Sequence, residues 1–200
     1  AAVGTVRESI ATGLSREGAT LLGGDAEIEL TYRFATRDER AWMERQADQV
    51  SEIVDFRSMA VTPDDARGLT QVKAVDGAYP LLGDVILSPE MPLSEALDGP
   101  GDMPGAVMHP LLSDRLGLAP GDTFRLGTQD FILTALIERE PDTAAAGFSL
   151  GPRTIVRTTA LDGSGLLAPG TLYSTKYRMD LPPAPDLTAL EDEATSTFPD

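Results

Sequence analysis

The chain contains no cysteine among its 200 residues, and His109 is its single histidine. Without cysteine there can be no disulfide, no thiolate nucleophile and no thiolate metal site. A Ser-His-Asp hydrolase would have to use His109, which stands directly before Pro110, where a helix is expected to begin. We expect this histidine to cap the helix or to face solvent. A zinc site would need His109 with carboxylates alone, which is an uncommon ligand set.

Positive charge is scarce, and long apolar runs are missing. The sequence has 16 Lys and Arg against 32 Asp and Glu, which gives a net charge of −16. A polyanion of this kind repels phosphate backbones, so no nucleic-acid partner is expected. The acidity either serves solubility or attracts a basic partner, and both interpretations stay open. No apolar run reaches the roughly 18 residues that a membrane-spanning helix requires.

Sequence motifs for catalysis and nucleotide binding are also missing. Neither G-x-x-x-x-G-K-[ST] nor a strand followed by G-x-G-x-x-G occurs. Gly163-Ser164-Gly165 does not have the G-x-S-x-G spacing of a nucleophile elbow, so we interpret it as a loop. Asp64-Asp65 lacks the calcium-loop spacing and is typical of a turn. We therefore expect a domain without catalysis, cofactor or metal.

Short strands and helices punctuated by glycine and proline fill the chain, which has Gly 19 and Pro 15. Residues 25–35 alternate apolar and polar side chains, the pattern of a strand with one buried face. Thr36 and Glu39 then form a T-x-x-E capping box at the start of a helix. Similar signals predict helices at 1–22, 36–46, 93–97, 111–116 and after Asp186, and strands at 25–35, 50–61, 69–75, 106–109, 123–126, 131–137, 154–158 and 172–181.

This order predicts an α+β fold with a discontinuous layout. Strand–helix–strand units at both chain ends, 1–80 plus 153–200, would build a mixed-sheet lobe. Residues 81–152 would form an inserted, smaller, strand-rich lobe with a short helix. Five aromatic residues of the first lobe are expected in its core, and the alternative is that they line an apolar groove for an acyl chain or a peptide: Tyr32, Phe34, Trp42, Phe56 and Tyr79.

The small-residue loop 144–152 carries the candidate contact residues Phe148 and Leu150. Apolar side chains in such a loop either tuck onto the core as a lid or form an exposed contact with substrate or partner.

Helical patterns reach both ends of the chain, which suggests excision from a longer protein; a mature secreted protein is the alternative.

The sequence resembles the periplasmic core domain of MacB-like, FtsX-type ABC-transporter permeases. The resemblance lies in Gly105–Gly127, GAVMHPLLSDRLGLAPGDTFRLG, and in Phe131–Ile137, FILTALI, where a short strand and helix precede a hairpin. Residues 51–60 and 71–81, SEIVDFRSMA and QVKAVDGAYPL, are similar to a subgroup of long permeases labelled as a predicted lysophospholipase-biosynthesis or export system.

This resemblance implies a periplasmic domain of a bacterial inner-membrane protein. It would couple a cytoplasmic ABC ATPase subunit to the movement of a periplasmic protein, lipid or lipoprotein, and would itself bind no ATP. Two alternatives remain at this point: a secreted serine hydrolase or esterase using Ser164 and His109, and a free-standing periplasmic binding protein.

Overall fold

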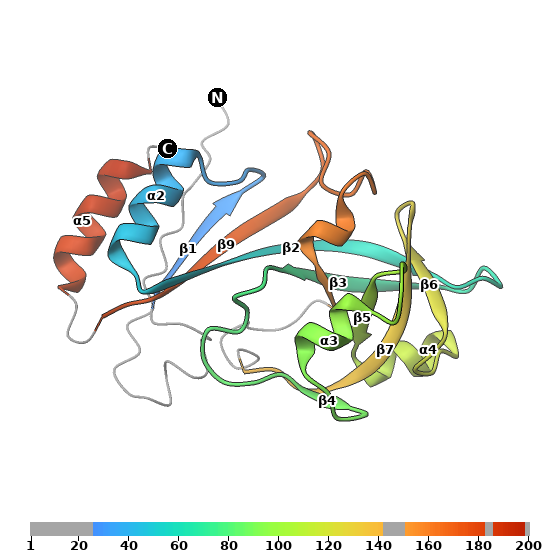
Figure 1. The fold of residues 1–200 in the computed structure, drawn as a ribbon. Helices are drawn as coiled ribbons and strands as arrows, with labels where there is room; N and C mark the ends of the chain where they lie inside the picture. Colours follow the sequence, from blue (N-terminus) through green and yellow to red (C-terminus); the bar gives the residue numbers. More distant parts are fainter. Residues whose placement is uncertain (1–25, 142–150, 183–185, 199–200) are drawn as a thin grey trace.

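The structure, a computed structural model, describes residues 26–141, 151–182 and 186–198. Figure 1 shows one twisted sheet with helices grouped at its two ends. In chain order the elements are β1 (Ala26–Thr31), α2 (Arg37–Gln46), β2 (Gln49–Val61), β3 (Arg67–Val75), β4 (Ile86–Ser88), α3 (Leu93–Asp98), β5 (Gly105–Met108), α4 (Pro110–Leu116), β6 (Thr123–Leu126), β7 (Gln129–Arg139), β8 (Arg153–Arg157), η1 (Thr158–Leu161), β9 (Tyr173–Asp180) and α5 (Leu187–Thr197).

The sheet of the described residues is mixed and partly closed. Its order is β1-β9-β2-β3-β8-β5-β7-β4, with parallel pairing only between β3 and β8 and between β5 and β7. β6 pairs with β7 and also with the far end of β2. Strands β2, β3, β8, β5, β7 and β6 therefore form a closed ring, while β1, β9 and β4 extend beyond it.

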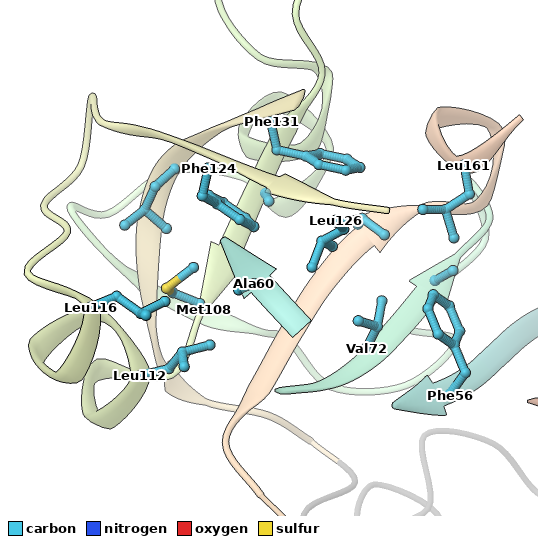
Figure 2. Packing of buried hydrophobic residues seen from close by; sticks show 14 of the residues in the cluster. Phe56, Ala60, Val72, Met108, Leu112, Leu116, Phe124, Leu126, Phe131 and Leu161 are labelled. Atoms are coloured by element: carbon cyan, nitrogen blue, oxygen red, sulfur yellow. The ribbon is translucent and has the colours of Figure 1, made fainter. Parts of the chain in front are cut away.

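The largest core fills this ring (Figure 2). Phe124 and Phe131 face each other from β6 and β7 with ring centroids 5.9 Å apart. Leu112 and Leu116 enter from α4, and Leu161 enters from η1. Each such side chain stabilises the fold by about 1.5–3 kcal/mol when it is fully buried. The ring is thus a packed interior without an open channel.

A second core lies under α2 and α5, which run side by side over β1, β9 and β2 (Figure 1). Trp42 of α2 meets Phe198 edge-on at 5.7 Å. The predicted capping box is confirmed, since the Thr36 side chain accepts from the Glu39 N–H and the Glu39 carboxylate accepts from the Thr36 N–H. Asp186 caps α5 as expected.

The α+β class and most of the predicted elements agree with the structure. The first strand ends early, because Tyr32 has a left-handed backbone (φ 59°) and the chain turns there. Tyr32 and Phe34, expected in the core, are instead 59% and 36% exposed. The β6–β7 turn is shorter than expected, with only Gly127 and Thr128 between the strands.

The expected helix at 1–22 lies outside the described residues. Elements β4 and η1 carried no clear sequence signal. The division at residues 80 and 152 stays a prediction, and strands from both expected lobes hydrogen-bond within the same sheet. No helix in the described ranges combines the length and apolar character needed to cross a membrane.

Candidate functional site

The predicted contact residues Phe148 and Leu150 lie outside the described residues, but the described chain on either side of them is held firmly. Glu140 directly follows β7, and Arg153 is the first residue of β8. The Arg153 Nε lies 3.4 Å from the Glu140 Oε2, and both side chains are nearly buried. This ion pair therefore fixes the two ends of the connection between β7 and β8.

The pair belongs to a larger group of charged side chains, which we call the ion cluster: Asp55, Lys73, Glu140, Arg153 and Lys176. Strand register explains why they meet. Asp55 stands opposite Lys73 in the β2–β3 ladder, and Gln71, two residues from Lys73, stands beside Arg153 in the β3–β8 ladder. Side chains two residues apart on a strand share a face, so these charges lie on the same side of the sheet.

Opposite charges alternate within the ion cluster. The Asp55 carboxylate receives the Arg153 Nη1 at 3.3 Å and the Lys176 Nζ at 3.2 Å. The Lys73 Nζ lies 3.9 Å from Glu140 and donates a hydrogen bond of 3.1 Å to the Tyr79 hydroxyl. The cluster thus connects β2, β3, β8 and β9 to the end of β7 and joins strands far apart in sequence.

The pKa of Lys176 depends on two opposing effects, burial and the negative charges around it. Burial lowers this pKa, but the negative charges of Asp55, Glu27 and Glu29 outweigh burial and raise it above the ordinary value. Lys176 therefore stays protonated and supplies a fixed positive charge. A lysine of this kind is suited to structural pairing and not to service as a base.

A second polar group lies at the start of α2. Arg33 holds Glu39 with two hydrogen bonds of 2.7 and 3.0 Å. The Tyr177 hydroxyl donates to Glu52 at 2.7 Å and accepts from the Ala35 N–H at 2.9 Å. Burial raises the pKa of Tyr177, and the Glu52 carboxylate raises it further. The phenol therefore stays protonated, and the group secures the chain entering α2.

The two residues of the hydrolase alternative are engaged in separate local turns. The His109 Nδ1 accepts the Leu111 N–H at 3.2 Å, so of the two roles expected for this histidine the helix cap is present. The Ser164 Oγ accepts the Leu166 N–H at 3.2 Å, and Ser164 is 4% exposed. In the described part of the chain no three His, Cys, Asp or Glu side chains are grouped so that they could hold a metal.

Two surface features offer places for contact. A cavity of about 320 Å³ lies between α3 and the turn at Pro120-Gly121. Exposed apolar side chains also gather where β1 ends and β9 begins: Leu172 is 73% exposed and Tyr32 59%. The Phe34 ring packs 5.5 Å from Tyr173 at the same place.

Proteins similar to this chain are found among ABC-transporter permeases. No family model matches the chain. It is 27% identical, over an alignment of 183 residues that covers 88% of this chain, to an uncharacterised ABC transporter permease of Escherichia coli strain K12, YbbP. The chain spans about a fifth of that relative's length, 21%.

Solved structures with a similar fold are also domains of transporter proteins. The periplasmic region of MacB from Actinobacillus actinomycetemcomitans matches with a TM-score of 0.52 at 10% identity, covering 80% of this chain and 70% of that one. A domain of a Porphyromonas gingivalis permease protein matches with 0.52 at 15% identity, covering 77% and 71%. The chain has the fold of a MacB-like periplasmic domain. The extracellular domain of the ABC-type transporter YknZ from Gram-positive bacteria is also similar, with 0.50 at 12% identity, covering 82% and 78%.

Sequence reasoning found the fold of this MacB-like domain but neither the ion cluster nor the cavity. The charged members of the cluster come from five separate places in the sequence, so no local pattern marks them. A signal for the cavity was present, because the residues from 74 to 114 include no Lys or Arg and are rich in proline and glycine. Such a stretch is typical of an irregular, negatively charged surface.

Proposed function

We propose that this chain is the extracytoplasmic domain of an ABC-transporter permease, located in the periplasm and engaging a cargo or a partner protein. The observation that carries the proposal is the similarity to YbbP along 88% of the chain, together with the fold of periplasmic and extracellular permease domains. A cytoplasmic ATPase would be a separate subunit. The domain would contribute no catalysis of its own.

The construction of the sheet supports a mechanical role. The closed ring, its packed core and the ion cluster connect the middle of the chain to the strands near both ends. Packed cores deform little, because their side chains interlock at near-crystalline density. The domain would therefore move as a rigid body when the membrane helices move, and would carry that motion to whatever it holds.

Labelling of the full-length permease from outside tests this proposal. Because the chain has no cysteine, Leu172→Cys would introduce a thiol into this domain at a 73% exposed position. A membrane-impermeant maleimide should label it in cells whose outer membrane alone has been permeabilised. The matched control is Val72→Cys, at a position with 0% exposure, which should stay unlabelled until the protein is denatured. Labelling of Leu172→Cys only after the inner membrane is broken would contradict the proposal.

The alternatives have separate tests. A serine hydrolase would be modified by a fluorophosphonate probe at Ser164, and the proposal expects no modification. A free-standing binding protein would have no membrane-spanning segments of about 20 apolar residues in its complete reading frame.

A further inference from the structure

The cavity between α3 and the Pro120-Gly121 turn has mainly apolar walls. Met91 and Pro100 contribute from the α3 side, and Ile132 and Leu133 contribute from β7. Its volume of about 320 Å³ is at the lower end of the roughly 300–1,000 Å³ range of ligand pockets. A space of this size suits one or two apolar side chains of a binding partner.

Both sides of the cavity are held in place by hydrogen bonds. The Thr134 hydroxyl donates to the Ala96 carbonyl at 2.8 Å, which fixes α3 to β7. On the other side, the Gly121 N–H donates to the Leu133 carbonyl at 2.7 Å, and the Leu133 N–H donates to the Asp122 carbonyl at 2.8 Å. The cavity is therefore preformed, and a partner would not have to spend binding energy on opening it.

Acidic residues stand on the cavity lining and next to it in the sequence. Glu95 lines the cavity and is exposed, and Glu90 and Asp122 are exposed sequence neighbours of the lining residues Met91 and Gly121. The chain between residues 74 and 114 contains seven acidic residues and no Lys or Arg.

One cation does reach α3. The Arg157 Nε pairs with Asp98 at 2.7 Å, and the same guanidinium donates to the Ser94 carbonyl at 3.2 Å. This pairing neutralises Asp98 and leaves the Glu95 carboxylate as the charge on the cavity lining.

From the apolar cavity and its acidic border we infer that this site binds a basic polypeptide segment of a partner protein, which inserts an apolar side chain flanked by Lys or Arg. An apolar anchor in a preformed pocket supplies affinity, and opposite charges at the rim supply orientation and speed of association. The inference rests on the proposed role as a partner-engaging domain and adds the chemistry of the partner. It also gives the acidity of the chain a use beyond solubility.

The test is a titration of the 200-residue chain with fluorescent peptides, followed by anisotropy at low salt. The probe is KKFKK; KKSKK lacks the apolar anchor, and EEFEE reverses the charge. KKFKK should bind about tenfold more tightly than KKSKK, the loss expected for a partly buried aromatic anchor. EEFEE should bind more weakly still, and raising the salt concentration should weaken the binding of KKFKK.

Variants locate the binding. Glu95→Lys should weaken KKFKK binding about fivefold or more, because it puts a cation on the cavity lining. Asp64→Lys, in the exposed β2–β3 turn, makes the same change in net charge and should leave the affinity within about twofold. Ile132→Trp fills the cavity and should remove the advantage of KKFKK over KKSKK.

An amide chemical-shift map of the unmodified chain avoids any folding defect of these variants. Shifts should concentrate at α3, Gly121 and Leu133, while the indole signal of the single tryptophan, Trp42, should stay unchanged. The inference is overturned by equal affinity for KKFKK and KKSKK, by equal weakening from Glu95→Lys and Asp64→Lys, or by shifts elsewhere. These outcomes leave the labelling test of location untouched, so the two proposals fail separately.

Discussion

Replacement of Asp55 by Asn tests whether the ion cluster stabilises the sheet. Asp55 lies on β2 between two cations, with Arg153 Nη1 at 3.3 Å and Lys176 Nζ at 3.2 Å. All three side chains are mostly buried, with exposures of 11%, 12% and 23%. Asn keeps the shape of Asp and removes only its charge, so the variant leaves two positive groups near a neutral amide.

The size of the effect follows from the geometry. At 3.3 Å the attraction of one such pair is about 5 kcal/mol at an effective dielectric constant of 20, and desolvation offsets most of it. Removing one partner of a buried pair usually costs about 3–5 kcal/mol. Here Arg153 keeps Glu140, and Lys176 keeps the nearby charges of Glu27 and Glu29. We therefore expect the free energy of unfolding to fall by about 2 kcal/mol.

Urea unfolding followed by circular dichroism measures this change. The matched control is Asp65→Asn, which breaks the exposed Asp65–Arg67 pair of 2.9 Å and keeps a residue that tolerates the left-handed backbone there (φ 66°). That variant should change stability by less than about 0.5 kcal/mol, since exposed pairs are screened by solvent. If both variants lower the free energy of unfolding equally, the ion cluster stabilises the sheet no more than an exposed ion pair does, and the reasoning is refuted.

The unchanged chain and Asp55→Asn should also differ in how their free energy of unfolding depends on pH. The folded pKa of Lys176 is raised above its ordinary 10.5, so its stabilisation is complete below pH 10.5 and is lost as the pH rises through the folded value. Asp55→Asn removes one cause of that shift. Its unfolding free energy should therefore fall less steeply than that of the unchanged chain when the pH is raised above 10.5.

Three further outcomes are expected. Thr36→Ala removes the side-chain acceptor of the capping box and should lower the unfolding free energy by about 1 kcal/mol in urea titrations. Burial raises the pKa of Glu39, but its hydrogen bonds to Arg33 and Thr36 outweigh burial, so the folded pKa lies below the ordinary 4.5. The stability that this carboxylate contributes should therefore be complete above pH 4.5 and decline when an acid titration passes the folded pKa. Gly105→Ala should destabilise by about 1–3 kcal/mol or more in thermal melts, because its Cβ would stand 1.9 Å from the Ala96 carbonyl oxygen, whereas Gly77→Ala meets nothing within 4 Å.

Most of the secondary structure could be predicted because its causes are local. The capping box of Thr36 and Glu39, the Pro110 start and Gly117 end of α4, and the alternation along β1 all act within a few residues. The prediction was wrong where a single backbone conformation ended an element. The left-handed Tyr32 stops β1 and exposes an aromatic ring that the alternating pattern had placed inside.

The candidate sites were far less predictable. Phe148 and Leu150 remain predictions from loop composition, since they lie outside the described residues. The ion cluster required the register of four strands, and the cavity required α3 to pack on β5 at the close distance that Gly105 permits.

The sequence by itself determined the class of the domain, its local caps and turns and its acidity, since these depend on neighbouring residues and on composition. Only the tertiary structure decided that β6 closes a ring by pairing with both β7 and β2, and that Asp55 meets Arg153 from 98 residues away. The reason is physical. Contacts between distant strands depend on register and on the curvature of the whole sheet, and no short stretch of sequence specifies either one alone.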